Sequence, residues 1–239
     1  MIHYHGTPIG GPNNDKAKFY QGRHACVSYA HPDDLEIVCE CCQSYFVDNG
    51  AFSLWKSGKD VDWDSYMDWI DALPRHPDFY LIPDVIGGTE LENRNLAFRY
   101  GRKHGAVPVY HLHESMEYLD FLCNNYAMVA IGSSGQWPNP GTDSWWARME
   151  EVMAVCCDSN GKPRVKLHGL RMLDPAIFTL LPFYSADSTN AARNNNQVNR
   201  FGMYVPPDAG RRACVIADRI EIHQSLEVWQ PSQQMQLFA

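Results

Sequence analysis

Eight short runs rich in β-branched and aromatic residues recur along the chain. They extend over Ile2 to His5, Ala25 to Tyr29, Tyr45 to Asp48, Phe79 to Asp84, Val107 to Leu112, Met128 to Gly132, Val165 to Leu170 and Phe183 to Asp187. Segments of helical character lie between most of them, at Pro32 to Cys42, Trp63 to Leu73, Glu90 to His104, Met116 to Asn124, Trp145 to Cys157 and Pro175 to Leu181. Such alternation is typical of parallel strands joined by crossover helices. The pattern predicts an α/β fold, a single (β/α)8 TIM barrel.

The length and composition agree with one barrel domain over residues 1–239. Closed α/β barrels of roughly 200 to 250 residues form single domains, and the 45% hydrophobic content allows a sizeable core. After about Asn190 the chain carries Asn194-Asn195-Asn196, Pro206-Pro207 and Gly210-Arg211-Arg212. This composition predicts a short irregular C-terminal extension that leads to a last strand-like stretch, Ala213 to Ile222.

Composition also excludes several classes of protein. No apolar run approaches the roughly 20 residues that a membrane span requires, and Met1-Ile2-His3-Tyr4 lacks the character of a signal peptide. We therefore expect a soluble, cytoplasmic protein without a membrane partner. Eight cysteines in so long a chain do not form a disulfide framework, so reduced thiols are expected. The net charge of -8 argues against non-specific coating of nucleic acid, although residues 160–239 hold nine Lys and Arg against six Asp and Glu.

Three aspartates stand at the predicted ends of strands three, four and eight: Asp48, Asp84 and Asp187. In a β/α barrel these strand ends form the active-site face, so the three carboxylates are expected around one pocket. Two carboxylates flanking a glycosidic bond suffice for double displacement, in which one attacks the anomeric carbon and the other handles the leaving group's proton. For any single aspartate, an ordinary role as a turn former or helix N-cap is the alternative.

Three segments resemble, in their order and spacing, the tRNA-guanine transglycosylase superfamily. Asp48-Asn49-Gly50-Ala51-Phe52 resembles its D-S-G-G-F/Y segment, and Val129 to Gly135 resembles its A-I-G-G-L segment. Asp187 to Arg193 resembles the nucleophile segment that ends T-R-N-A-R. The resemblance covers roughly Asp48 to Asn194 and implies a base-exchanging pentosyltransferase on a TIM barrel.

The resemblance also implies a role for each matching residue. Asp187 would be the nucleophile, and Asp48 the acid/base at the nitrogen that joins base to sugar. Asp84 would read the guanine edge by accepting from its ring N–H and exocyclic amine. The further base-binding residues that the resemblance implies are Phe52, His113, Ser133, Ser134, Gly169 and Leu170.

One departure bears on the polymer substrate. The tRNA-acting members carry a C-x-C-x-x-C zinc cluster and a later His after the nucleophile, whereas only Cys214 follows Asp187 here. The chain is more similar to a compact branch, found in phages and bacterial gene clusters, that exchanges guanine in DNA for a 7-deazaguanine. The resemblance thus implies DNA and a free 7-deazaguanine as partners, an aspartyl-deoxyribose intermediate, no cofactor, and the host cytoplasm for a phage-encoded protein. tRNA is the alternative polymer.

Guanine in a duplex cannot reach a barrel pocket, so the target nucleotide must be flipped out or unpaired. The candidate phosphate contacts are Arg193, Arg200, Arg211 and Arg212. A merely solvated basic surface is the alternative interpretation of these four side chains.

Histidine and cysteine clusters support rival hypotheses. One rival is a metal-dependent amidohydrolase barrel, in which histidines and a carboxylate hold zinc and activate water. The candidate residues for such a site are His3, His5, His111, His113, His168 and Asp187. No lysine ends the fourth predicted strand to bridge two metals, which argues against this hydrolase. Cys39, Cys41 and Cys42 with His24 or His31 could form another zinc site, but packing as small apolar residues is favoured, and we predict no metal. A non-catalytic nucleic-acid binding module is a third class, against which the pair Asp48 and Asp187 argues.

Overall fold

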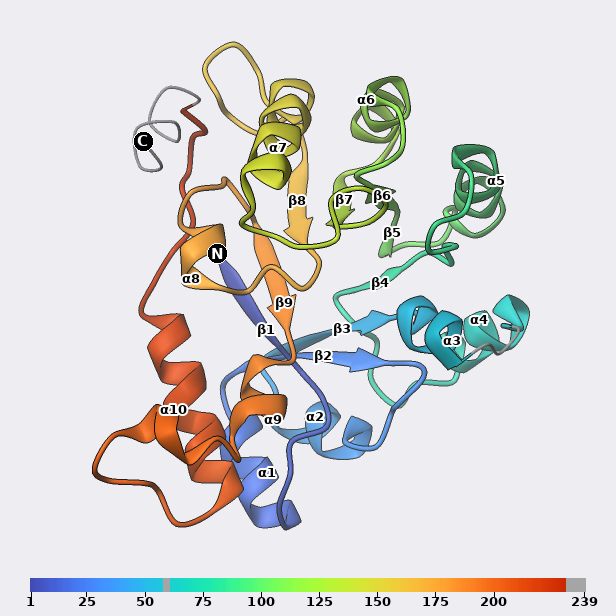
Figure 1. Cartoon of the computed structure of the whole chain (residues 1–239). Coiled ribbons are helices and arrows are strands. Elements are labelled where there is room, and N and C mark those ends of the chain that lie inside the picture. The colour runs from blue at the N-terminus through green and yellow to red at the C-terminus, as the bar shows by residue number, and fades with distance from the viewer. Residues whose placement is uncertain (58–60, 231–239) are drawn as a thin grey trace.

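The computed structural model describes residues 1–57 and 61–230, which form one parallel sheet wrapped by helices (Figure 1). The strand order is β5-β4-β3-β2-β1-β9-β8-β7-β6. The strands are β1 Ile2–Gly6, β2 His24–Ser28, β3 Ser44–Asp48, β4 Phe79–Leu81, β5 Ala106–Val107, β6 Val109–His111, β7 Met128–Gly132, β8 Lys166–Gly169 and β9 Ser185–Ser188.

A break at Pro108 explains why this sheet has nine strands rather than the eight predicted. The first half of the predicted fifth strand, β5, pairs with β4 through Leu81 and Val107, whereas the second half, β6, pairs with β7 through Val109 and Ala130. Proline has no N–H to donate to the ladder, but the Pro108 carbonyl still accepts from the Ala130 N–H at 2.9 Å. β5 and β6 are therefore two halves of one strand that closes the ring, and the predicted TIM-like barrel is confirmed.

The helices cover the outside of the barrel (Figure 1). They are α1 Asn13–Tyr20, α2 Leu35–Cys41, α3 Ala51–Ser57, α4 Trp63–Asp71, α5 Glu90–Tyr100, α6 Met116–Asn125, α7 Asp143–Cys156, α8 Pro175–Phe178, α9 Asn190–Asn194 and α10 Ala209–Glu221, with a 3-10 turn at Val198–Phe201. The sequence patterns predicted α2 and α4 to α8 with shifted ends, but they missed α1, α3, α9 and α10. Within the described ranges, no helix combines the length and the apolar character that crossing a membrane demands.

The predicted strand-like stretch Ala213 to Ile222 is wrong, because this segment belongs to helix α10. Ala213, Ile216, Ala217 and Ile220 are buried, and their spacing of three and four residues is that of one helical face. The Asp208 side chain caps the helix by accepting from the Arg211 N–H at 2.7 Å. The C-terminal extension is therefore a helical segment that packs against α1 and α9, not an irregular tail.

Aromatic side chains fill the barrel interior. Tyr4, Phe46 and Phe79 lie on β1, β3 and β4, and the rings of Phe46 and Phe79 stack with centroids 4.6 Å apart. The fully buried His168 ring meets the Phe46 ring edge-on at 4.8 Å. Interiors of such barrels are packed cores and not pores. The interior layer therefore forms an apolar floor beneath the strand ends.

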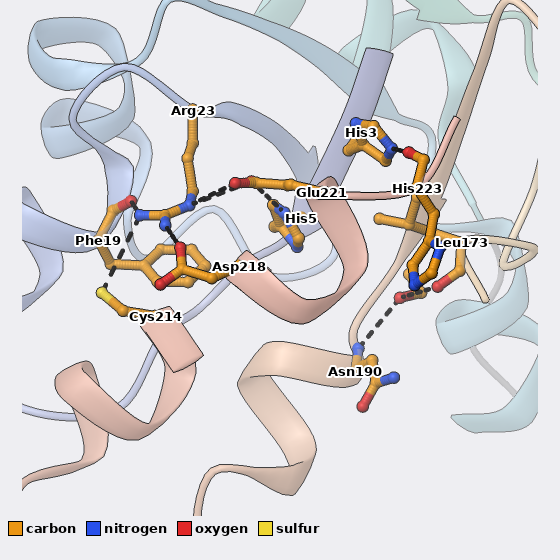
Figure 2. A network of polar contacts seen from close by, with 11 residues as sticks. His3, His5, Phe19, Arg23, Leu173, Asn190, Cys214, Asp218, Glu221 and His223 are labelled. Carbon is orange, nitrogen blue, oxygen red and sulfur yellow. Dashed lines mark hydrogen bonds and ion pairs between the residues drawn. The ribbon is translucent and has the colours of Figure 1, made fainter. Parts of the chain in front are cut away.

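A polar network joins the end of α10 to β1 and to Arg23, the residue before β2 (Figure 2). The fully buried His5 ring reaches Oε1 of Glu221 through Nε2 at 2.8 Å. Arg23 donates to the same carboxylate at 3.1 Å and also pairs with Asp218. Arg23 further donates to the Phe19 carbonyl at 2.9 Å. The network fixes the last turn of α10 against the barrel wall.

We expect Glu221→Ala to lower the free energy of unfolding by about 1–3 kcal/mol at pH 7, because it leaves the buried His5 and Arg23 donors without their acceptor. Burial alone would raise the pKa of Glu221, but the hydrogen bond from His5 and the charges of His5 and Arg23 outweigh it, so the pKa is lowered from 4.5. A lowered pKa gives stability that is present above pH 4.5 and is lost as the pH falls below it.

Urea unfolding followed by circular dichroism at pH 7 and pH 3.5 measures this loss. The exposed Glu40 of α2 is the matched control, and Glu40→Ala should change the free energy of unfolding by less than about 0.5 kcal/mol. An equal effect of the two substitutions at pH 7 would show that the network does not stabilise the fold.

Candidate active site

A cavity of about 350 Å³ opens where the strands end, above the aromatic floor. Its walls come from segments that follow β3, β4, β6, β7, β8 and β9. The predicted site residues that line it are Asp48, Phe52, Asp84, Ser133, Ser134, Leu170 and Asp187. Apolar walls with a few convergent polar groups are typical of small-ligand sites, so the three predicted carboxylates do share one pocket.

Asp48 is the last residue of β3, and the chain turns sharply after it. Gly50 has φ 75°, and a side chain there would meet Ala30 at 2.9 Å, so this turn requires glycine. Burial, together with the charges of Asp187 and Asp84, raises the pKa of Asp48 to about 7. A pKa near neutrality allows this carboxyl either to donate or to accept a proton.

Asp84 lies three residues beyond the end of β4 and is held by two neighbours. Its Oδ1 accepts from Asn49 Nδ2 at 2.7 Å, and its Oδ2 lies 2.8 Å from Nε2 of His111. Burial alone would lower the pKa of His111, but the hydrogen bond and charge of Asp84 and the charge of Glu114 outweigh it and raise the pKa. The two contacts fix the orientation of the Asp84 carboxyl group.

Asp187 lies on β9, and the described contacts of its carboxylate converge on one oxygen. Oδ1 accepts from the Arg171 backbone N–H at 2.9 Å and lies 3.4 Å from Nε2 of His168. His168 is itself oriented by Ser185, whose Oγ lies 2.8 Å from Nδ1. Among the described residues no donor contacts Oδ2. The described contacts therefore hold one oxygen of the Asp187 carboxylate and not the other.

Sequence reasoning missed three residues of this cavity or gave them another role. Asn49 was only part of a motif, His111 was considered as a metal ligand, and Arg171 was not singled out. A signal for Asn49 was its place between two predicted pocket residues, and a signal for His111 was its position at the end of strand five. Nothing in the sequence marked Arg171.

Two predicted base-binding residues lie behind the wall rather than on it. His113 contacts Ser134 Oγ through Nδ1 at 2.9 Å and the Gly88 carbonyl through Nε2 at 2.9 Å, so it orients a wall residue. At Gly169 a side chain would come within 2.8 Å of the Phe183 ring, so this glycine allows β8 to pack closely. The Ser133 hydroxyl accepts from Trp145 Nε1 at 2.9 Å, which fixes its position on the wall.

The four predicted phosphate-binding arginines lie outside the cavity, around α9 and the start of α10. Arg193 and Arg200 are exposed, and Arg200 donates to Gln197 at 2.7 Å. Arg211 pairs with Asp208 at 3.2 Å. Arg212 donates to the carbonyls of Asn195 and Pro206, at 2.5 Å and 2.9 Å. The Arg212 guanidinium is therefore engaged by backbone carbonyls of the protein, whereas Arg193 and Arg200 lie on a solvent-facing surface.

The structure separates the histidines of the amidohydrolase hypothesis. His3 packs edge-on against Phe178 of α8, and His5 faces Glu221 of α10, so both rings lie outside the barrel. Residues 1–57 and 61–230 contain no group of three or more His, Cys, Asp or Glu side chains placed to hold a metal ion. That statement covers Cys39, Cys41 and Cys42, which are free thiols.

Comparisons with known proteins leave this site to be interpreted from its own geometry. No protein-family model matches the chain, and neither curated proteins nor solved structures yielded a match. The cavity holds one carboxyl that can move a proton, one with an uncontacted oxygen and one in a fixed orientation. Three carboxyl groups with different surroundings therefore lie within one small volume.

Asp48→Asn is expected to stabilise the protein, because the variant no longer ionises a carboxyl beside Asp84 and Asp187. A pKa raised from 3.8 to about 7 means that the wild type loses stability as the pH rises through this interval. The advantage of the variant should be small near pH 4 and about 4 kcal/mol above pH 7, since each unit of pKa shift corresponds to about 1.4 kcal/mol.

Urea unfolding at pH 4.5, 6 and 8 measures this difference. The exposed Asp68 of α4 is the control, and Asp68→Asn should show no such change over the interval. A constant difference between Asp48→Asn and wild type from pH 4.5 to pH 8 would contradict the raised pKa.

Proposed function

We propose that this protein is a DNA-guanine transglycosylase, which exchanges guanine in DNA for a 7-deazaguanine base. The observation that carries the proposal is the convergence of Asp48, Asp84 and Asp187 on one cavity, with a pKa of about 7 at Asp48. The resemblance of their segments to the guanine transglycosylase superfamily supplies the reaction. The three carboxylates divide the work of nucleophile, acid/base and base recognition.

In the first half-reaction, Asp187 attacks C1′ of the deoxyribose through its uncontacted oxygen. The C1′–N9 bond breaks, its electron pair leaves with guanine, and protonated Asp48 supplies the proton that makes the leaving base neutral. The sugar is then held as an ester of Asp187. A carboxyl with a pKa of about 7 supplies this proton efficiently near neutral pH.

In the second half-reaction, the Asp48 carboxylate takes the N9 proton of the incoming deazaguanine. The freed electron pair attacks C1′, and the Asp187 carboxylate leaves, which restores both aspartates to their starting states. No redox change occurs, and protons balance over the cycle. The same group therefore serves as acid and base in turn.

Asp84 is suited to choose the base. Asn49 and His111 hold its two oxygens, and the remaining lone pairs can accept from the ring N–H and exocyclic amine of guanine. The apolar residues Phe46, Leu81 and Leu170 line the same cavity and can contact the base. A cavity of about 350 Å³ takes a single base and not a paired one, so the target must leave the helix.

Release of labelled guanine tests the reaction. Wild-type protein with guanine-labelled duplex DNA, single-stranded DNA or tRNA, plus a 7-deazaguanine, should release label from DNA. Asp187→Ala should abolish release, whereas Asp68→Ala on the outer surface should leave it unchanged. Label released from tRNA alone would show that the substrate is tRNA and not DNA. No release from any polymer would reject transglycosylation.

A second test addresses Asp84. The wild type should bind free guanine about 10- to 100-fold more tightly than hypoxanthine, which lacks the exocyclic amine. Asp84→Asn should reduce this preference to a few-fold, because an amide replaces one acceptor by a donor. Isothermal titration with both bases measures the two affinities. A preference that survives in Asp84→Asn would assign base recognition to another group.

A further inference from the structure

Arg171 has an unusual backbone at the rim of the cavity. Its φ is 59°, and it is the only non-glycine residue with positive φ in residues 1–57 and 61–230. L-residues avoid this region for steric reasons, and such outliers gather at functional sites. The conformation directs the Arg171 backbone N–H to Oδ1 of Asp187 at 2.9 Å. The main chain at this position therefore orients the proposed nucleophile.

The side chain of Arg171 lies over an aromatic ring at the same rim. Its guanidinium carbon is 4.4 Å from the centroid of the Phe52 ring, and both residues line the cavity. Cation–π stacking restrains a flexible side chain and leaves the edge of the guanidinium available. Arg171 is exposed, so this edge can meet a ligand that approaches from solvent.

Acidic side chains outnumber Lys and Arg side chains around the cavity. Of the side chains that line the cavity in the described part of the chain, Arg171 is the only Lys or Arg, and three are aspartates. Although these carboxylates share its cavity, Arg171 forms no ion pair with any described acidic residue. Three carboxylates repel a phosphodiester, and a positioned guanidinium offsets that repulsion through paired hydrogen bonds.

We propose that the Arg171 guanidinium binds the phosphate of the nucleotide whose base enters the cavity, while its backbone N–H positions Asp187. This inference rests on the proposed function and adds a specific phosphate site to it. Arg193 and Arg200 lie outside the cavity, where they could contact phosphates of the DNA strand next to the target nucleotide. In this proposal, Arg171 contacts the phosphate through its side chain and Asp187, which attacks C1′, through its backbone N–H.

Substitution by glycine separates the two roles. Arg171→Gly keeps a backbone N–H and accepts a φ of 59° without strain, so only the guanidinium is removed. Arg102 provides a matched control, because its guanidinium also stacks on an exposed phenylalanine, Phe98, at 4.7 Å, away from the cavity. Arg171→Lys is the third variant and keeps the charge without the planar fork.

The affinities of 2′-deoxyguanosine, its 5′- and 3′-monophosphates and inorganic phosphate are measured by titration calorimetry. The wild type and Arg102→Gly should bind one monophosphate roughly tenfold or more tightly than the nucleoside. Arg171→Gly should bind both equally, and Arg171→Lys should lie between. The binding of single-stranded DNA should also show a logarithmic salt slope reduced by about 0.7 in Arg171→Gly.

Equal nucleoside and monophosphate affinities in the wild type, or a monophosphate preference that persists in Arg171→Gly, would overturn the inference. Inorganic phosphate that binds as tightly as the nucleotide would also overturn it, because the site would then be a general anion site. Loss of the preference in Arg171→Gly without guanine release by the wild type rejects transglycosylation alone. Guanine release with no effect of Arg171→Gly on binding rejects the phosphate site alone.

Discussion

The three carboxylates in one small cavity repel each other, and the surrounding structure must offset this repulsion. The charge of Asp84 is balanced by a hydrogen bond from Asn49 and by the imidazole of His111, whose pKa is raised. Asp187 receives the Arg171 backbone N–H. Asp48 has no comparable cationic partner, and its pKa rises to about 7. Burial and the two neighbouring carboxylates therefore distinguish Asp48 as the carboxyl with the raised pKa.

The strand ends were the part of the site that the sequence could predict. β-branched runs that end in an aspartate mark both the strands and the mouth of a barrel, so the sequence alone predicts that Asp48, Asp84 and Asp187 lie at one face. The order of strands around the barrel follows from short, right-handed crossovers. The local sequence pattern and the long-range geometry thus both place these three aspartates at the mouth of the barrel.

The remaining details depend on contacts that a linear pattern does not contain. The His111–Asp84 pair joins two different strands, and the positive φ of Arg171 follows from the loop that it closes. The β-branched Ile216 and Ile220 are residue types common in strands, but their burial follows the helical spacing of α10, so residue type alone does not identify this helix. The outward orientation of His3 and His5 likewise depends on strand register, which one residue of shift would reverse.

The break at Pro108 gives the barrel a seam. Among the described residues, the last backbone hydrogen bond between the fourth and fifth strands runs from the Ile82 N–H to the Val107 carbonyl at 2.9 Å. Beyond it, the side chains of Asp84 and His111 continue the closure at 2.8 Å. The pair of side chains that completes the barrel wall thus also lines the cavity. A ligand that contacted this pair only in the folded barrel would therefore stabilise the barrel wall as it bound.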